Sequence, residues 1–357
     1  MVKLHRRDFI RASLFGGIAA ATIPSYAMKV LDEQTQATIA TNSRVSLVAG
    51  NNRTEMVFNA LQPFAKEIAQ AVGNRRIIVK PNLVEKDIQL CATHKDTIEG
   101  ILEFYKSINK LENVVIAESI AFDQVIDCYD CYGYIPVAEK YKVKLLDLDA
   151  LPFQWHYVMD ESDWIPKPIR VSSLLTDRNN FVMSAARLKT HNTVVATLTL
   201  KNLLMGAPLK DPGYHSHAVT NSTSGKRIMH GNGVRAFNYN LFGLAYHVRP
   251  DLGFVDGYDG MEGNGPTRGT QVDHRICVAG LDWMAVERVC LALMDIDPAK
   301  VGYLTYCAGA GMGQFDLSKI EITGEQLAKH IRTYKLPPNI NNQLQWMTPM
   351  VRENRRT

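Results

Sequence analysis

Ionisable and amide side chains follow the downstream ends of four short apolar runs in this sequence of 357 residues. Residues 77–79, 114–116, 181–183 and 252–255 each have the length and composition of a buried β-strand. In an open parallel sheet, ligands bind in the crevice outside the carboxyl ends of the strands. We therefore predict a binding or catalytic site at that edge of the sheet. The alternative is that these polar residues only cap strands and hold turns.

The residue types at this edge suit a small anionic ligand. Lysines can hold phosphate or carboxylate groups, asparagines can fix a ligand through paired amide hydrogen bonds, and carboxylates can act as general bases or hold a hard cation. The three sets are Lys80, Lys189 and Lys201; Asn82, Asn202 and Asn264; and Glu118, Asp256 and Glu262. We predict that Lys80 and Lys189 hold the anion and that His191 moves protons. Asp256 and Glu262 would position the substrate or a metal, and Lys189, His191 and Glu262 are the candidate catalytic residues.

Histidines raise the question of a bound metal. His215 and His217 lie in a long polar loop over residues 206–232, and His230 stands near its end. Three imidazoles and a carboxylate can form a ligand set for zinc or another transition metal. The alternative is that these are solvated loop histidines. The cofactor is therefore left open, with a divalent or transition metal as the candidate.

Cys128 and Cys131 have the spacing of a redox pair or of half a zinc site. The sequence holds no second pair of this spacing to complete a tetrathiolate zinc site. A redox accessory function, a structural disulfide and two unreacted thiols remain as alternatives. Cys277, Cys290 and Cys307 lie in apolar patterns and are expected to be small core residues.

The N-terminus resembles a twin-arginine export signal. Arg6 and Arg7 precede a polar residue, a phenylalanine and an aliphatic residue; His5 stands where Ser or Thr is usual, and Arg11 where Lys is usual. The following apolar stretch is shorter than the ~20 residues that span a bilayer, and the residues before Ala27 suit cleavage after it. The resemblance implies export by the twin-arginine translocase to the periplasm or another extracytoplasmic space. A basic arm followed by an amphipathic helix is the alternative.

The charge balance limits the classes of partner. Residues 1–27 hold four Lys or Arg residues and one Asp, so they account for +3 of the formal net charge of +4. After their removal the chain is near neutral and lacks the basic footprint of a nucleic-acid-binding protein. No later segment is long and apolar enough for a membrane span. We expect a small anionic ligand, no nucleic-acid partner and no stable membrane span after signal cleavage.

Strand and helix patterns alternate through most of the chain, as in an α/β protein. We predict a mainly parallel sheet with helices on both faces, in one or two α/β lobes. Later segments are less regular: residues 154–158 and 169–171 are predicted to be extended, 197–205 and 234–247 helical, and 256–269 a glycine-rich loop. The predicted organisation is a signal peptide (1–27), a linker (28–43), an α/β domain (44–336) and a C-terminal tail (337–357).

Several short motifs resemble a family of unknown function, number 362. They are residues 80–82, 92–94, 188–191, 200–202, 250–252 and 256–257, and the most specific is Met-Glu-Gly-Asn-Gly-Pro over 261–266. The resemblance implies a shared fold and site but no reaction, because that family has no general assigned activity. It adds Thr93 and His94 to the candidate binding residues and places His230 where the family often has a histidine. We expect an enzyme acting on a small anionic substrate; a binding module without chemistry is the alternative.

Overall fold

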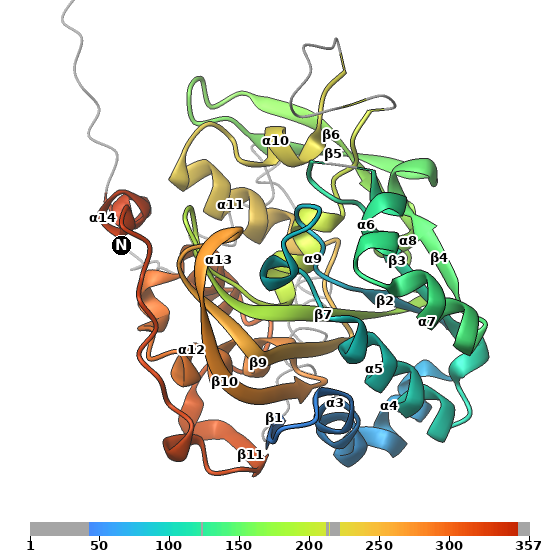
Figure 1. Ribbon diagram of the computed structural model, residues 1–357. Coiled ribbons are helices and arrows are strands. Elements are labelled where there is room, and N and C mark those ends of the chain that lie inside the picture. The colour runs from blue at the N-terminus through green and yellow to red at the C-terminus, as the bar shows by residue number, and fades with distance from the viewer. Residues whose placement is uncertain (1–42, 123, 212–213, 215–221, 349–357) are drawn as a thin grey trace, which may run out of the picture. The chain divides into compact units, whose positions relative to one another are not determined.

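The computed structural model describes residues 43–122, 124–211, 214 and 222–348, and Figure 1 shows their arrangement. The predicted signal peptide with Arg6, Arg7 and Ala27 lies outside the described residues, as do His215 and His217. No helix among the described residues is long and apolar enough to cross a membrane.

A mixed sheet forms the centre of the protein, with nine strands among the described residues. Its order is β11-β1-β10-β9-β7-β2-β3-β4, and β8 pairs with β7. The strands are β1 (Ser43–Ala49), β2 (Arg76–Lys80), β3 (Val114–Glu118), β4 (Lys144–Asp147), β7 (Asn180–His191), β8 (Val195–Thr197), β9 (Leu252–Asn264), β10 (Arg268–Gly280) and β11 (Ile320–Gly324). Strands β4, β3, β2, β7 and β9 pair in parallel, as do β1 and β11, whereas β10 is antiparallel to β9 and β1. The predicted α/β fold with a mainly parallel sheet is confirmed.

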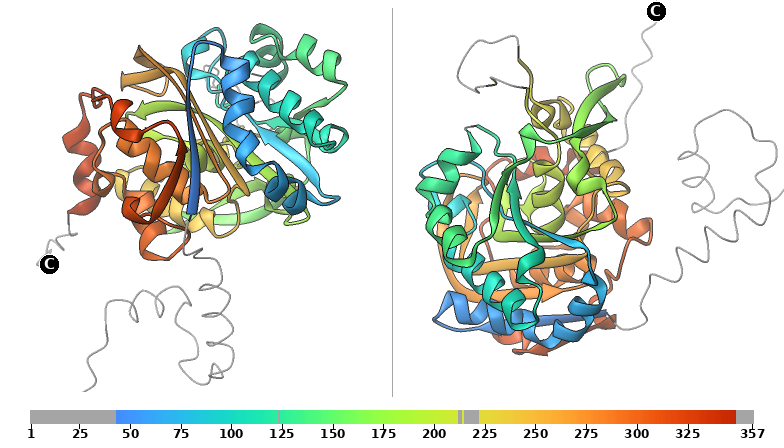
Figure 2. Two further views of the ribbon diagram at one scale, coloured as in Figure 1. Left: turned by 90° about the horizontal axis from the view of Figure 1, so that it is seen from below. Right: turned by 90° about the vertical axis from the view of Figure 1, so that its right-hand side faces the viewer.

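Helices cover both faces of the sheet (Figures 1 and 2). Within β2, Ile77 and Val79 pack into one hydrophobic cluster and Ile78 into the other, because successive side chains of a strand point to opposite faces. The first cluster includes α3 (Arg53–Leu61), α4 (Ala65–Val72), α5 (Lys95–Ser107), α6 (Val125–Cys131) and α7 (Tyr134–Tyr141). The second includes α9 (Thr199–Gly206), α11 (Val234–Ala245), α12 (Trp283–Leu293) and α13 (Gly302–Gly309). A strand buried on both faces in this way is an almost continuous apolar run, which is why β2 could be recognised in the sequence.

A separate two-stranded hairpin lies beside the second cluster. It consists of β5 (Phe153–Met159) and β6 (Pro166–Ser172), which pair antiparallel and confirm the two predicted extended segments. The short helices α8 (Ser173–Thr176) and α10 (Gly225–Met229) contact it, and α14 (Ile340–Gln343) lies near the C-terminus.

The prediction of a glycine-rich loop over residues 256–269 is wrong. Strand β9 continues to Asn264, and β10 starts at Arg268, so the stretch is mostly a long hairpin. Glycines in this hairpin allow other segments to pack closely against it. A Cβ at Gly260, for example, would lie 2.0 Å from the Tyr334 hydroxyl oxygen. Glycine in a strand often marks such a close approach of another segment, whereas the prediction assigned these glycines to a loop.

Candidate functional site

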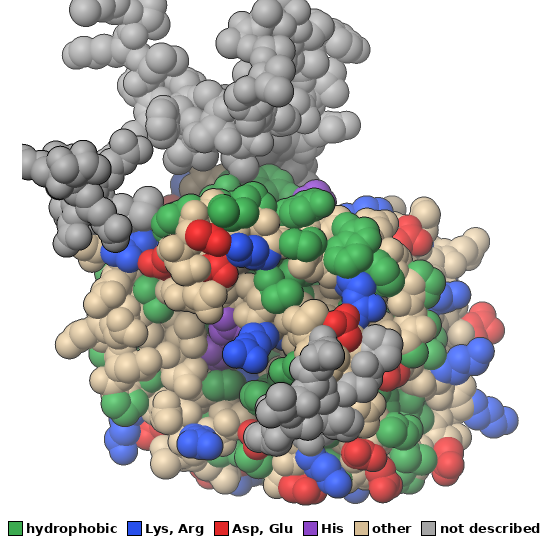
Figure 3. All heavy atoms as spheres, turned by 90° about the horizontal axis from the view of Figure 1, so that it is seen from above, with side chains coloured by type: hydrophobic (Ala, Val, Ile, Leu, Met, Phe, Trp, Pro, Cys, Tyr) green, Lys and Arg blue, Asp and Glu red, His purple; other side chains and the backbone are tan. Residues whose placement is uncertain are grey.

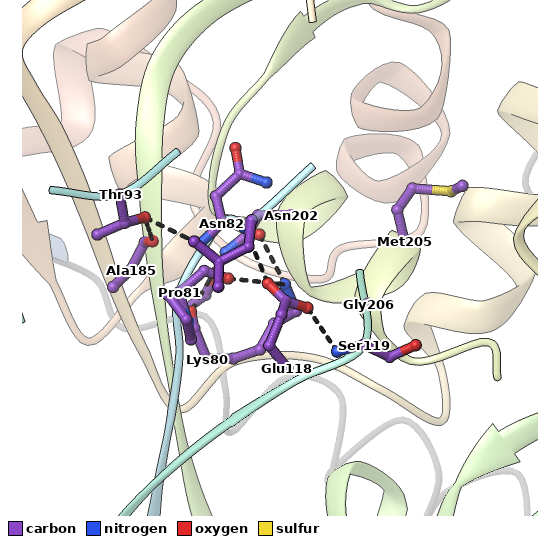
Figure 4. A network of polar contacts seen from close by, with 12 residues as sticks. Lys80, Pro81, Asn82, Thr93, Glu118, Ser119, Ala185, Asn202, Met205 and Gly206 are labelled. Atoms are coloured by element: carbon purple, nitrogen blue, oxygen red, sulfur yellow. Dashed lines mark hydrogen bonds and ion pairs between the residues drawn. The ribbon is translucent and has the colours of Figure 1, made fainter. Parts of the chain in front are cut away.

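Strands β2 and β3 end beside one another, and their last residues form a buried ion pair. Lys80 Nζ lies 2.7 Å from Glu118 Oε2 (Figure 4). The same amino group donates to Asn202 Oδ1 at 2.9 Å and to the carbonyl oxygen of Pro81 at 2.7 Å. An ammonium has three N–H donors, so all the donors of Lys80 are used within the protein. In this arrangement Lys80 positions Asn202 and the end of β3, and its predicted contact with an anion stays a prediction.

Glu118 is equally occupied. Its Oε2 accepts the backbone N–H of Leu83 at 3.0 Å, and its Oε1 accepts that of Ser119 at 2.9 Å. Helix α9 comes close because its last residue is Gly206, where a Cβ would lie 1.8 Å from Lys80 Cε. The Lys80–Glu118 pair thus holds the chain segments that follow β2 and β3 against the end of α9.

A pocket of about 130 Å³ lies next to this ion pair. Since one water molecule occupies ~30 Å³ in the liquid, the pocket holds about four waters or a ligand of similar size. On the face seen in Figure 3, a histidine and basic side chains gather around a hollow. The predicted site residues that line the pocket are Lys80, Asn82, Glu118, Lys189, His191, Lys201, Asn202 and His230. Residues from β2, β3, β7 and α9 are thus brought together at the carboxyl edge of the sheet.

Two lysines in the pocket wall lack an acidic partner. Lys189 Nζ donates to the carbonyl oxygen of Cys91 at 2.8 Å, and burial lowers the pKa of Lys189 to about 7. Lys201 is 5 % exposed, and its amino group lies 5.8 Å from the centre of the Phe237 ring. Burial lowers the pKa of Lys201 well below its usual value, and the neighbouring lysines lower it further. Among the described residues, neither amino group has a carboxylate within ion-pair distance or all of its donors bonded.

His191 and His230 are held in opposite tautomers. His191 Nδ1 accepts the backbone N–H of Thr193 at 3.0 Å, which leaves the proton on Nε2. His230 Nδ1 lies 2.7 Å from the carbonyl oxygen of Lys226 and must donate to it, which leaves Nε2 as an acceptor. Burial lowers the pKa of His191 well below its usual value and that of His230 to about 4. Both rings are therefore neutral near pH 7, one presenting a donor and the other an acceptor.

The sequence did not single out two residues that also line the pocket, Lys226 and Thr197. Lys226 Nζ donates to the carbonyl oxygens of Met205 at 2.9 Å and Pro208 at 2.8 Å, where the last carbonyls of α9 need donors. No periodic pattern marks Lys226, which lies within the long polar loop predicted over residues 206–232. Thr197 was expected only as the start of a helix. The Thr197 hydroxyl and Asn82 Oδ1 are buried without a hydrogen-bond partner in the described part of the chain.

Asp256 does not line the pocket, contrary to prediction. Its Oδ2 accepts the Thr97 hydroxyl at 2.7 Å and lies 3.3 Å from Arg53 Nε and 3.5 Å from Arg187 Nη1. The parallel register between β7 and β9 shifts between Arg187 and Lys189. Because β9 continues beyond Asp256 instead of ending there, this carboxylate is enclosed by arginines within the sheet region.

Glu262 and Asn264 also lie apart from the pocket lining. Glu262 Oε2 accepts the backbone N–H of Lys335 at 2.9 Å, and Glu262 Oε1 lies 3.4 Å from the Lys335 amino group. Asn264 is the exposed last residue of β9 and pairs with Arg268. The structure therefore gives Glu262 a contact with the C-terminal segment in place of the predicted catalytic position.

Thr93 and His94 support the pocket without lining it. The Thr93 hydroxyl accepts the backbone N–H of Asn82 and donates to the carbonyl oxygen of Ala185, each at 2.8 Å. This bridge fixes the chain after β2 against β7. His94 caps the first turn of α5, where its Nδ1 accepts the backbone N–H of Asp96 at 3.1 Å.

The predicted metal site receives no support from the described part of the chain, where no group of three His, Cys, Asp or Glu residues is placed to hold a metal ion. His230 has one ring nitrogen bonded to a carbonyl, and its ring stacks on Phe237 with 4.3 Å between centres. His215 and His217 lie outside the described residues.

Cys128 and Cys131 lie in the last turn of α6 and form no disulfide with one another, and neither lines the pocket. Burial is the main cause of a raised pKa of Cys131. A thiol reacts as its thiolate, so this environment does not activate it for redox chemistry. Cys277, Cys290 and Cys307 are buried, which confirms them as core residues.

Fold and pocket together define an α/β protein with a lysine- and histidine-lined pocket at the carboxyl edge of its sheet. The chain belongs to the family of the domain of unknown function DUF362, whose model matches residues 77–292. It is also similar to the thylakoid-associated protein sll1697 of Synechocystis sp. (strain ATCC 27184 / PCC 6803 / Kazusa), with 24% identity over 229 residues. That match covers 63% of this chain and 65% of the relative, which is less than two thirds of the relative's length. The resemblance seen in the motifs is confirmed at the level of the family.

Proposed function

We propose that this protein is an enzyme that binds a small anionic substrate in the pocket and exchanges a proton with it. The observation that carries this proposal is the pair of buried amino groups, Lys189 and Lys201, with no carboxylate within ion-pair distance among the described residues. Burying a charge is unfavourable unless a partner is present. A bound anion supplies that partner and would make the protonated form of both lysines favourable.

Lys189 is the proposed proton-exchanging group. Its pKa, lowered to about 7 by burial, lies where a side chain can both accept and release a proton near neutral pH. A nearby anion favours the ammonium form and raises this pKa, so anion binding takes up a proton. Affinity for the anion should therefore fall as the pH rises above about 7.

A binding protein without chemistry would use the same pocket, and Lys189 separates the two possibilities. In a binding protein, Lys189→Arg keeps a cation and retains function in full. In an enzyme, the same substitution keeps the charge but removes a group that can lose its proton near pH 7, because arginine stays protonated. Turnover would then be lost while substrate binding persists.

Calorimetric titration at pH 7 with phosphate, sulfate and acetate tests the anion site. We expect at least one of these anions to bind, and Lys201→Met to weaken that binding at least tenfold, ~1.4 kcal/mol. Lys140→Met, which removes an exposed lysine of α7, is the matched control and should leave the affinity unchanged. Absence of binding by every anion, or equal binding by the Lys201 variant, would reject the proposed site.

We also propose export through the twin-arginine translocase to the periplasm, with residues 1–27 as the signal and 28–43 as the linker. Arg6 and Arg7 followed by an apolar stretch and Ala27 support this proposal. The name of the Synechocystis relative associates that protein with a membrane system, which is in keeping with work at or beyond a membrane. Replacing Arg6 and Arg7 by Lys should leave the precursor in the cytoplasm. Normal appearance of this double variant in the periplasmic fraction would contradict the assignment.

A further inference from the structure

The pocket wall combines hydrogen-bond donors with acceptors that have no partner among the described residues. The donors are the amino groups of Lys189 and Lys201 and the Nε2–H of His191. The acceptors are His230 Nε2 and Asn82 Oδ1. A site built only to attract negative charge would have no use for exposed lone pairs, because they repel the oxygen atoms of an anion.

The acceptor on His230 is fixed by its surroundings. Its Nδ1–H donates to the carbonyl of Lys226, and the amino group of Lys226 is bonded to carbonyls at the end of α9. Phe237 stacks on the ring and fixes its plane. The other tautomer would set the Nδ1 lone pair against the lone pairs of the Lys226 carbonyl. His230 Nε2 therefore keeps its lone pair for the pocket.

Asn82 provides an amide that offers an acceptor in one orientation and a donor in the other. Its side chain is 6 % exposed, and its Oδ1 has no hydrogen-bond partner among the described residues. The Thr93 hydroxyl fixes the backbone of Asn82, so the side chain is held at the pocket. Leaving a buried polar atom without a partner is unfavourable, and a ligand that donates a hydrogen bond removes this penalty.

We infer that the pocket selects an oxyanion that still carries a proton, a singly protonated phosphate, over sulfate. This inference rests on the proposed anion site. Phosphate and sulfate have the same tetrahedral shape and five heavy atoms, which suits a pocket of about 130 Å³. Hydrogen phosphate offers oxygens to Lys189, Lys201 and the His191 donor, and its one O–H to an acceptor. Sulfate has no proton near neutral pH and would leave His230 Nε2, whose tautomer is fixed, facing an oxygen lone pair.

The first experiment compares inorganic phosphate, sulfate and glycerol phosphate by calorimetric titration of the purified protein at pH 7. Each unsatisfied acceptor corresponds to about ten- to a hundredfold in affinity, so phosphate should bind at least tenfold more tightly than sulfate. Glycerol phosphate at pH 7 is mostly a dianion whose phosphoryl group has no O–H, so we expect it to bind more weakly than phosphate. Binding of glycerol phosphate as tight as that of phosphate would overturn the inference, because the pocket would then not depend on the phosphate proton. Equal binding of phosphate and sulfate overturns it while leaving the anion site intact, and no binding by any anion rejects both.

His230→Phe tests the origin of the selectivity. The variant keeps a ring against Phe237 but removes the acceptor, so the preference for phosphate over sulfate should shrink at least fivefold. His247→Phe is the control, because His247 follows the end of α11 and does not line the pocket. This variant should keep the preference for phosphate over sulfate unchanged. An unaltered preference in His230→Phe overturns the role given to His230.

Nitrogen NMR of histidine-labelled wild-type protein provides a check that needs no variant in the pocket to fold. We expect His230 to carry its proton on Nδ1 and His191 on Nε2 at pH 7. The reverse assignment for His230 would overturn the inference.

Discussion

Arg187 and Lys189 stand two residues apart on β7, yet they belong to two kinds of buried charge. Arg187 and Arg53 meet Asp256, and their guanidinium groups also bond to Asp259, through its backbone oxygen and its carboxylate respectively. In this arginine–aspartate cluster, two cations face two anions. Lys189 is as deeply buried, but the one hydrogen-bond partner of its amino group among the described residues is a neutral carbonyl.

The difference separates buried charges that stabilise the fold from buried charges that are available to a ligand. A paired cluster stabilises its surroundings as long as both partners stay. Buried amino groups without an acid are destabilising until a ligand arrives, and such strain collects at functional sites. Burial alone therefore does not identify the site. Buried amino groups that line a pocket and have no carboxylate partner among the described residues do so here.

Breaking the paired cluster should have the largest effect. Asp256→Ala leaves Arg53 and Arg187 buried without their shared carboxylate, so we expect the free energy of unfolding to fall by about 3–5 kcal/mol. Urea unfolding measures this change. Asp273→Ala removes an exposed carboxylate from β10 and should have little effect. A loss no larger than that of the control would show that the arginine–aspartate cluster is not structural.

Removing an unpaired charge should act in the opposite direction. Lys201→Met keeps an unbranched apolar side chain of similar length but removes the buried amino group. Without ligand we expect the variant to gain about 1–3 kcal/mol of stability, since replacing buried ionic groups by apolar ones is often stabilising. Urea unfolding in anion-free buffer is the measurement. Destabilisation similar to that of Asp256→Ala would erase the distinction between the two clusters.

Stability should depend on pH through the lysines. The pKa of Lys189 is about 7 in the folded protein and ~10.4 in an unfolded chain. Between these values the unfolded chain binds more protons, so this group makes stability rise with pH from about 7 to 10, by at most ~1.4 kcal/mol per pH unit. Lys189→Met should reduce the slope of stability against pH. Part of the slope should remain in this variant, because the pKa of Lys226 is also lowered to about 7.

Saturating phosphate provides the control for that slope. A bound anion raises the pKa of Lys189 in the folded protein and brings it closer to the unfolded value. The slope of wild-type protein should then approach that of Lys189→Met. Equal slopes for wild type and variant in anion-free buffer would contradict the lowered pKa.

The sequence predicted the half of the site that follows from strand endings. Lys80 and Glu118 are the last residues of β2 and β3, and Lys189 and His191 lie at the end of β7, so the rule for parallel sheets brought them to one edge. The same rule failed for Asp256, because β9 does not end where its apolar run ends. Glycines that make room for Tyr334 carried no sign of that role in the sequence.

Roles were harder to predict than positions. Nothing in the sequence shows that the Lys80 donors are saturated, because their partners come from residues 81, 118 and 202. Lys226 enters the pocket from a segment with no periodic pattern, and it decides the tautomer of His230. The Lys80 bonds to Glu118 and Asn202 join segments far apart in the sequence and depend on tertiary packing, which local patterns do not encode.

Glu287 offers the smallest test per pH unit, because it is a buried acid that is hydrogen-bonded but has no cation within ion-pair distance in the described part of the chain. Its Oε1 accepts the backbone N–H of Leu200 at 2.7 Å and the Thr199 hydroxyl at the start of α9, while Oε2 has no partner in the described part of the chain. Burial raises the pKa of Glu287 to about 7, above the ~4.3 of an unfolded chain. The folded protein then binds more protons between these values, so this group makes stability fall as the pH rises from 4.3 to 7. Glu287→Gln keeps the acceptor for Leu200 and stays neutral. Relative to wild type, its stability should rise between pH 5 and pH 8 by about 2–3 kcal/mol in all, which is less than ~1 kcal/mol per pH unit. A relative fall in urea unfolding over that range would mean that the ionised acid is the favoured form.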